Sequence, residues 1–256
     1  MVETTETFLV MRKMIILIYG ILAYIIFLIA FLYSIGFVNN LWVPKGIDIG
    51  VEINLMTALL FNVGLLSLFA LQHSIMTRPA FKKWWVQIMG KPAERSTYIL
   101  LTSLALLLLF WKWEPMPTTV WTIENNSMVI SVQVIYFIGW SIVLLSIFIN
   151  SHFELFGLTQ IVDNLKKNVS KSPSFEANFF YGLVRHPLML GFLIAFWATP
   201  TMTASHLLFA VVTTFYILFA VKFLEERDLK KALGETYINY QKKVPMLIPF
   251  TKLSKQ

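Results

Sequence analysis

The chain has 256 residues, of which 57% are hydrophobic and 14% are charged, and its formal net charge is +7. A soluble domain usually carries about a quarter charged residues, so this composition indicates a membrane protein. The basic residues are confined to short loops, which suits membrane insertion and anionic lipid headgroups and argues against a nucleic-acid-binding protein. The sequence has no cysteine, which excludes disulfides, thiolate metal sites and a thiol nucleophile within the protein.

Long apolar segments predict an all-α fold, a polytopic transmembrane helical bundle of about six helices. The candidate spans in chain order are 14–37, 53–76, 97–111, 129–151, a short segment 188–200, and 204–224. The first follows Arg12-Lys13, is too long for a signal-peptide core and has no small-residue cleavage site after it, so we expect an anchor. The short segment closes at Pro200, about three residues before the last span, which predicts a tight helical hairpin. Its length leaves open whether it crosses the whole membrane.

The distribution of lysine and arginine predicts the orientation of these spans. Six crossings place 19 of the 21 lysines and arginines on one side of the membrane and only Lys45 and Lys112 on the other. By the positive-inside rule, this bias puts both termini in the cytosol. Five crossings would separate the basic C-terminal tail from the other basic loops, so we expect six.

The last third of the chain concentrates residues that can carry chemistry around the hairpin. They are Tyr181-Gly182-Leu183-Val184-Arg185-His186-Pro187, then Glu225-Glu226-Arg227-Asp228-Leu229 after the hairpin, then Gly234, Tyr237, Tyr240 and Val244-Pro245. A proline in the first turn of a helix loses no hydrogen bond, so Pro187 is expected to begin the short helix. Arg185 and His186 then lie at a helix N-terminus, where free N–H groups and a guanidinium favour an anionic group.

The hairpin returns Glu225 and Glu226 to the same side of the membrane as Arg185. This mixture of charges matches a ligand with a carboxylate, cationic groups and hydroxyls, and S-adenosylmethionine carries all three. Simpler interpretations stay open from the residues alone. Arg185 and Glu225 would also fit an interfacial ion pair, and His186 would fit a structural residue. Tyr237 and Tyr240, three apart on a helix, would fit an ordinary interfacial pair.

The order R-H-P, hairpin, E-E-R-D-L, G-x-x-Y-x-x-Y and V-P resembles the C-terminal signature of the isoprenylcysteine carboxyl methyltransferase-like superfamily. Within it, VRHPLMLGFLIAFWATPTMT, LQHSIMTRP at 71–79 and HFELFGLTQ at 152–160 are similar to bacterial methanethiol S-methyltransferases. The resemblance extends over residues 60–250 or so. It implies a single membrane domain over 1–256, with N-terminal transmembrane helices in 14–151 and a C-terminal methyltransferase region in 152–250.

The resemblance also implies an activity. We expect S-adenosylmethionine to bind from the cytosol and to methylate methanethiol to dimethyl sulfide, in a bacterial inner membrane whose lipids are the protein's other partners. The expected cofactor contacts are Tyr181, Arg185, His186, Pro187, Glu225, Glu226, Tyr237 and Tyr240. One departure matters: Met189 stands where carboxyl methyltransferases often have a tyrosine, so no acceptor role is carried over to that position.

Polar residues near the cytosolic ends of other spans supply candidates for the chemistry of the acceptor. A thiol reacts as its thiolate, so a group that accepts a proton is needed, and His73 and His152 are the candidates. Arg78, Gln160 and Trp197 are candidates for substrate binding. Interfacial capping is the alternative for these polar side chains. Because the sequence has no i, i+4 histidine pair and no HExxH pattern, we expect no metal site.

Other functional classes fit part of this pattern. A carboxyl or lipid methyltransferase with a larger acceptor would share the C-terminal motifs, and so would a non-enzymatic NnrU-like membrane protein. A transporter or a subunit of a membrane complex fits less well. Transporters often show inverted repeats and broken mid-membrane helices, and the sequence has neither.

Overall fold

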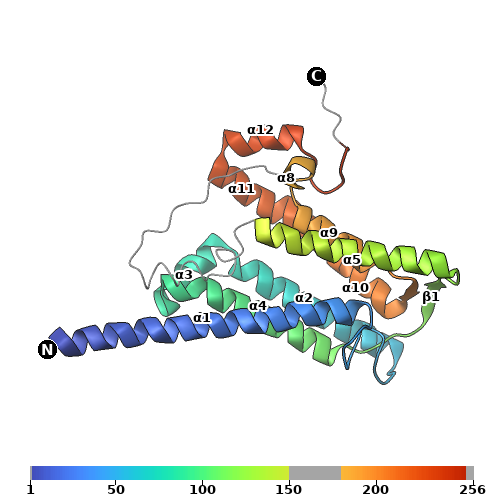
Figure 1. Cartoon of the computed structure of the whole chain (residues 1–256), viewed down its shortest axis with the longest axis horizontal. Helices are drawn as coiled ribbons and strands as arrows, with labels where there is room; N and C mark the ends of the chain where they lie inside the picture. Colours follow the sequence, from blue (N-terminus) through green and yellow to red (C-terminus); the bar gives the residue numbers. More distant parts are fainter. Residues whose placement is uncertain (1, 150–179, 252–256) are drawn as a thin grey trace. The chain divides into compact units, whose positions relative to one another are not determined.

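The computed structural model describes residues 2–149 and 180–251, and its architecture is all-α, as predicted (Figure 1). Among the described residues, one two-stranded ribbon accompanies the helices. The elements are α1 Val2–Val38, α2 Leu55–Met76, α3 Pro79–Met89, α4 Lys91–Lys112, β1 Thr119–Thr122, α5 Asn126–Ile149, α8 Phe180–Leu183, α9 Pro187–Trp197, β2 Thr201–Thr203, α10 Ala204–Phe219, the π-helical turn η1 Ala220–Glu225, α11 Glu226–Leu233 and α12 Glu235–Lys243.

Five helical stretches are long and apolar enough to cross a membrane, so the chain is an integral membrane protein. They are Val10–Val38, Leu55–Met76, Lys91–Lys112, Asn126–Ile149 and Ala204–Leu233. The short apolar helix α9 has 11 residues. At 1.5 Å per residue it covers about 16 Å, roughly half of a ~30 Å hydrocarbon core. As a helix it ends at Trp197, before the predicted boundary at residue 200.

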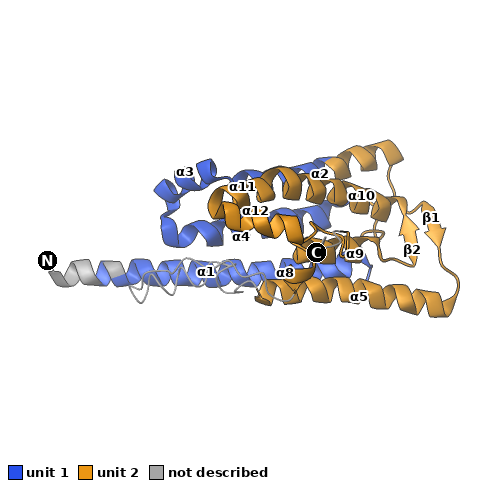
Figure 2. Cartoon of the chain, turned by 90° about the horizontal axis from the view of Figure 1, so that it is seen from above, with its two compact units in different colours: residues 1–46, 64–113, 150–173 blue, residues 47–63, 114–149, 174–256 orange. Residues whose placement is uncertain are grey.

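The chain divides into two compact units (Figure 2). Unit 1 contains 1–46, 64–113 and 150–173, and unit 2 contains 47–63, 114–149 and 174–256. The division runs through α2, whose first residues belong to unit 2 and whose remaining residues belong to unit 1.

In unit 1, α1 packs along α4. The Tyr19 hydroxyl donates to Thr97 Oγ1 over 2.9 Å, and the Phe37 ring lies 4.6 Å from Phe110 and 6.0 Å from Trp113. Helix α4 begins at Lys91, six residues before the predicted start of this span at 97. Its first turns carry charged residues, and this polar start explains why an apolar pattern places the helix boundary too late.

Helix α3 precedes α4 in unit 1 and was not predicted as a separate element. It contains no buried residue, and its Trp84 side chain is exposed. It combines Trp84 with neighbouring lysines, a composition typical of a helix that lies in the plane of the membrane interface.

In unit 2, α5 packs closely against α9. A Cβ added at Gly139 would lie 2.7 Å from the backbone nitrogen of Ala195, and one added at Gly191 would lie 2.7 Å from the Gly139 carbonyl oxygen. The two backbones therefore approach each other only because both positions are glycine. Small residues at helix contacts are a common way to bring transmembrane backbones together.

Helices α9 and α10 of unit 2 form the predicted hairpin, and the rings of Phe196 and Phe209 meet at 5.0 Å. The turn between them contains β2, which pairs antiparallel with β1 through Thr119 opposite Thr203 and Thr122 opposite Thr201. This ribbon was not predicted, because strands of three and four residues leave no alternating apolar pattern in the sequence.

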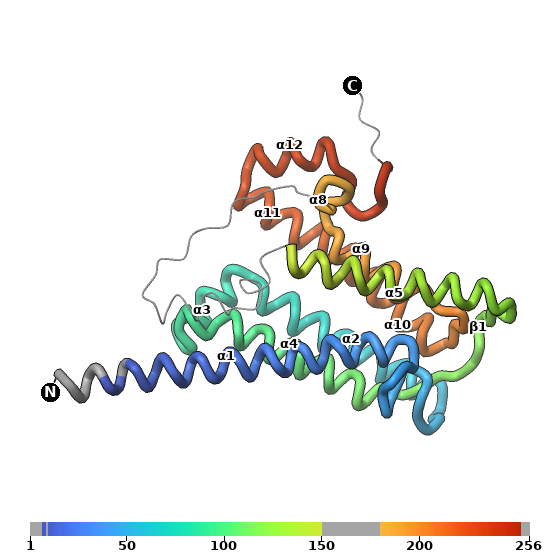
Figure 3. Tube along the Cα trace, in the orientation of Figure 1, coloured from blue at the N-terminus to red at the C-terminus, as the bar shows by residue number. Residues whose placement is uncertain are grey.

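Helix α10 continues through η1 into α11, and the chain then reverses into α12 (Figure 3). The reversal occurs at Gly234, whose φ of 56° lies in the left-handed region. Glycine adopts this conformation without steric cost, so α12 can fold back beside the end of α11.

Candidate functional site

Arg185 and Glu226 form a buried ion pair at the start of α9. Arg185 Nε donates to Glu226 Oε1 over 2.6 Å, and the two side chains are 7% and 9% exposed. Arg185 Nη1 donates to the carbonyl oxygens of Val244, at 2.5 Å, and Gln241, at 3.3 Å. A buried pair is favourable only when further hydrogen bonds satisfy both charges, and these carbonyls supply them on the arginine side.

His186 joins this pair to the neighbouring carboxylate. Its Nε2 lies 3.1 Å from Glu226 Oε1 and its Nδ1 lies 3.5 Å from Glu225 Oε2. Burial by itself would lower the pKa of His186, but hydrogen bonds to Glu225 and Glu226 and their charges outweigh it and raise the pKa to about 9. The imidazole is therefore a cation at neutral pH. Arg185, His186, Glu225 and Glu226, called the Arg185 cluster below, hold two positive and two negative charges.

Helix α12 adds side chains to the Arg185 cluster. The Tyr237 hydroxyl donates to Glu226 Oε1 over 3.4 Å, and Gln241 Nε2 donates to Glu226 Oε2. The Tyr240 hydroxyl donates to the Tyr181 carbonyl oxygen over 2.5 Å. Burial raises the pKa of Tyr240 to about 12 and also raises that of Tyr237. Both hydroxyls stay protonated at neutral pH and keep their protons for donation.

The segment after α12 covers the backbone at the start of α9. The Arg185 amide donates to the Pro245 carbonyl oxygen over 2.9 Å, and the His186 amide donates to that of Met246 over 3.2 Å. The Val-Pro motif thus has a structural role. Its carbonyl groups accept hydrogen bonds from the amide and the guanidinium of Arg185, and they hold this residue in place.

The two consecutive glutamates stand where the π-helical turn η1 ends, at Glu225, and α11 begins, at Glu226. The Glu226 amide bonds to the Val221 carbonyl oxygen, five residues back. The Glu226 side chain points into the cluster and is 9% exposed, whereas that of Glu225 is 46% exposed. One carboxylate is therefore structural and the other is open to a ligand. Single π-turns within α-helices occur frequently at functional sites.

The eight predicted cofactor residues all lie in unit 2. Five of them, Arg185, His186, Glu225, Glu226 and Tyr237, form one connected network, Tyr181 and Tyr240 bond to each other, and Pro187 is the first residue of α9. One pairing differs from the simplest expectation. Arg185 pairs with the buried Glu226 rather than with Glu225, whose side chain is 46% exposed.

The family model described as "NnrU protein" matches residues 61–248 of the chain. The chain belongs to the NnrU protein family. It is similar to "Methanethiol S-methyltransferase 1" of Bradyrhizobium diazoefficiens, with 49% identity over 94% of this chain and 84% of the relative. "Methanethiol S-methyltransferase 2" of the same organism is 50% identical over 93% of this chain and 91% of the relative.

"Methanethiol S-methyltransferase" of Mycobacterium tuberculosis is 45% identical over 94% of this chain and 98% of that protein. None of the solved structures matches the chain. The resemblance to methanethiol S-methyltransferases predicted from the C-terminal motifs is thus confirmed, and the NnrU match includes the whole Arg185 cluster.

The NnrU match also includes His73 and Arg78, which lie in unit 1. The Tyr98 hydroxyl of α4 lies 3.1 Å from each ring nitrogen of His73, so it can donate to either, depending on the tautomer. Arg78 Nε donates to the Ser74 carbonyl oxygen over 3.1 Å and Nη2 donates to Thr77 Oγ1 over 3.0 Å. Arg78 therefore caps the C-terminal end of α2.

The other predicted substrate residues have different positions. Trp197 ends α9 and donates from Nε1 to Thr214 Oγ1 over 2.9 Å. The length of α9 places it about 16 Å from the Arg185 end of this helix, so the two do not share one site. His152 and Gln160 lie outside the described residues, and their roles stay predictions.

Sequence reasoning missed two side chains that contact predicted residues, one in each unit. Gln241 binds Glu226 and lies four residues after Tyr237 on the same face of α12, so helical periodicity provided a signal for it. Tyr98 binds His73 from a helix 25 residues away in the chain. Such a contact depends on how α2 and α4 pack, and no local pattern marks it.

Proposed function

We propose that this protein is an integral membrane methyltransferase that uses S-adenosylmethionine to convert methanethiol to dimethyl sulfide. The observation that carries the proposal is the 49% and 50% identity with two proteins named methanethiol S-methyltransferase over more than nine tenths of the chain. In this reaction a new bond forms between the thiolate sulfur and the methyl carbon, and the bond from that carbon to the sulfonium breaks. S-adenosylhomocysteine leaves, and the thiol proton passes to a base or to water.

The Arg185 cluster fits S-adenosylmethionine through two groups that its internal contacts leave available. The Glu225 carboxylate is 46% exposed and can accept hydrogen bonds from ribose hydroxyls or from the amino group. Nε of Arg185 donates to Glu226 and Nη1 donates to the carbonyl oxygens of Val244 and Gln241. Nη2 has no hydrogen-bond partner among the described residues and can donate to a carboxylate. When bound, the cofactor would supply an electrophilic methyl group on a sulfonium.

The remaining members of the cluster act as positioning residues in this proposal. Glu226 accepts hydrogen bonds from Arg185, Tyr237 and Gln241, so it fixes α9, α11 and α12 relative to one another within unit 2. His186 then holds the Glu225 carboxylate from the protein side. Displacement at a sulfonium needs reactants held in line, and a rigid site of this kind contributes to the rate by orientation.

His73 is our candidate for the group that removes the thiol proton. Its ring is held by the hydroxyl of Tyr98 and packs against Phe69, whose ring lies 5.5 Å away. An imidazole titrates near neutral pH and so can accept a proton from a thiol under working conditions. Tyr98 would orient the ring and fix its tautomer. His152 is the second candidate for the base.

The reaction is tested with purified protein in lipid nanodiscs, labelled S-adenosylmethionine and either methanethiol or a prenylated cysteine. We expect labelled dimethyl sulfide in the headspace and no label on the prenylated cysteine. Label on the larger acceptor alone would reassign the protein as a carboxyl methyltransferase. Binding of the cofactor without any methyl transfer to either acceptor would reject the proposed substrate.

The base is tested with His73→Ala and Tyr98→Phe. If His73 removes the proton, His73→Ala should lower turnover roughly 10²- to 10⁴-fold at neutral pH. The defect should shrink as the pH rises toward the pKa of the thiol, and calorimetric affinity for the cofactor should not change. Tyr19→Phe is the matched control, because it removes another tyrosine hydroxyl that bonds two helices of unit 1 but does not contact His73. Full activity of His73→Ala would leave His152 or solvent as the proton acceptor.

A further inference from the structure

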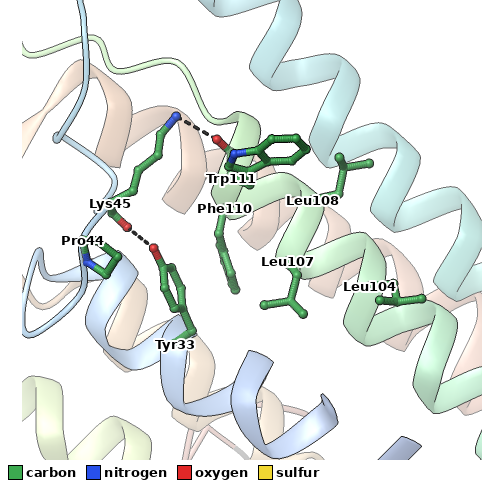
Figure 4. A pocket seen from close by; sticks show the side chains of 8 residues that line it. All are labelled: Tyr33, Pro44, Lys45, Leu104, Leu107, Leu108, Phe110 and Trp111. Atoms are coloured by element: carbon green, nitrogen blue, oxygen red, sulfur yellow. Dashed lines mark hydrogen bonds between the residues drawn. The ribbon is translucent and has the colours of Figure 1, made fainter.

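A groove opens in unit 1 where α1 and α4 end (Figure 4). It has a volume of about 630 Å³, and its walls include Tyr33, Lys45, Leu104, Leu108, Phe110 and Trp111. The Tyr33 ring stacks on Phe110 at 5.5 Å, and its hydroxyl donates to the Lys45 carbonyl oxygen over 2.9 Å. These contacts fix the loop after α1 against the end of α4, so the groove is built into the fold of this unit.

The groove has an apolar floor that faces outward. Leu104 and Leu108 lie one turn apart on α4 and are 45% and 37% exposed, and Trp111 at the end of the helix is 66% exposed. Exposed apolar side chains on a membrane-spanning helix contact lipid chains. Tryptophan at a helix end is typical of the membrane interface. The groove therefore runs from the interface toward the hydrocarbon region.

Two lysines contact Trp111: Lys45, which lines the groove, and Lys112, the next residue of α4. Lys45 Nζ donates to the Trp111 carbonyl oxygen over 2.9 Å, and Lys112 Nζ lies 3.9 Å from the centre of the Trp111 ring. Lys45 is the only lysine or arginine between Lys13 and Arg78, and Lys112 is the only one between Arg95 and Lys166. Neither lysine forms an ion pair with a carboxylate in the described part of the chain.

We propose that this groove binds an anionic phospholipid, with the phosphate at Lys45 and Lys112 and one acyl chain along Leu104 and Leu108. A phosphodiester supplies the negative charge that the two ammonium groups lack, and the apolar floor continues directly from them. Methanethiol is small and uncharged, so it would use neither lysine. The proposal concerns a site in unit 1 and does not depend on methyl transfer.

Native mass spectrometry of the detergent-purified protein tests the proposal, with phosphatidylglycerol and phosphatidylcholine of the same chain length as probes. The wild-type protein should bind phosphatidylglycerol more tightly. In the variant Lys45→Gln/Lys112→Gln this preference should fall roughly tenfold or more, as two interfacial lysines together would provide. The control Lys230→Gln/Lys231→Gln makes the same charge change on exposed residues of α11 and should keep the preference.

Two further variants separate the parts of the site. Lys112→Gln leaves the hydrogen bond between Lys45 and Trp111 intact, and it should still reduce the preference if the charges act together. Leu104→Trp fills the apolar floor and should weaken the binding of both lipids while the lysines remain. An unchanged preference in the double-lysine variant, an equal loss in the α11 control, or full displacement of the lipid by glycerol phosphate would overturn the proposal.

Discussion

Glu226 accepts hydrogen bonds from three different side chains. The donors are Arg185, Tyr237 and Gln241, and the carboxylate also contacts the protonated His186. In Glu226→Gln, two buried cations lose their shared counter-charge. Removal of one partner of a buried ion pair typically costs about 3–5 kcal/mol. We expect a marked fall in the thermal unfolding temperature in detergent.

Glu225→Gln is the matched variant for this comparison, because it makes the same change one residue earlier on a side chain that is 46% exposed. It should lower the unfolding temperature less than Glu226→Gln does, because it removes only the contact with His186. It should also bind S-adenosylmethionine at least about tenfold more weakly, a loss of about 1.4 kcal/mol. If the two glutamine variants instead had the same stability, Glu226 would not be the structural member of the pair.

His186 makes stability depend on pH in a direction that the structure specifies. Its pKa is raised from 6.5 to about 9 by Glu225 and Glu226 against the opposing effect of burial. A raised pKa in the folded state gives stability that is complete below about pH 6.5 and is lost as the pH rises through about 9, on the order of 3 kcal/mol in total. The unfolding temperature should therefore fall between pH 7 and pH 10. His186→Asn should be less stable at pH 7 and show a flatter profile, and an equally steep profile in this variant would place the titrating group elsewhere.

The sequence predicted which residues form the site, but it did not predict how they pair. The motif order identified Arg185, His186 and both glutamates, because a hairpin returns the chain to the same side. It did not predict that Arg185 pairs with Glu226 rather than Glu225. Consecutive residues of a helix point about 100° apart, so only one of the two glutamates can face Arg185, and the motif does not say which one.

Helix α5 packs against α9 through two glycines, one on each helix. A methyl group at Gly191 would lie 2.7 Å from the Gly139 carbonyl oxygen and 2.8 Å from Val143 Cγ2. Gly191→Ala should therefore separate the helices and destabilise the protein by about 1–3 kcal/mol. Gly64→Ala in α2 is the control, since nothing lies within 4 Å of the position that its methyl group would take. An alanine there should be neutral or stabilising by up to about 1 kcal/mol, as thermal unfolding of both variants would measure.

The long apolar helices were predictable from the sequence, whereas the short elements that connect them were not. Runs of apolar residues identify a transmembrane helix whatever its partners are, so all five long spans matched predicted segments. Helix α3 and the ribbon of β1 and β2 are short and contain polar residues. The ribbon forms because the folded chain brings β1 and β2 together from positions about 80 residues apart, and a local pattern does not report that.

The topology of the whole molecule depends on whether the chain from Pro187 to Thr203 crosses the membrane. Helix α9 alone covers about 16 Å. The six residues after it, 198–203, can add up to about 20 Å when extended, since each residue spans up to about 3.3 Å. In unit 2, β2 pairs with β1, which precedes α5, while the Arg185 end of α9 lies at the other end of this helix. This pairing favours a full crossing and six crossings in total.

Reporter fusions test this topology directly. Alkaline phosphatase, which is active only outside the cytosol, should be active when fused after Asp48 or after Glu124, the residues between α1 and α2 and between β1 and α5. It should be inactive at the C-terminus, where a fluorescent protein should instead be bright. The reason is the bias of 19 lysines and arginines to one side against Lys45 and Lys112 on the other. Activity at both residue 48 and the C-terminus would require an odd number of crossings between the two termini. The short α9 would then have to enter and leave the membrane on one side.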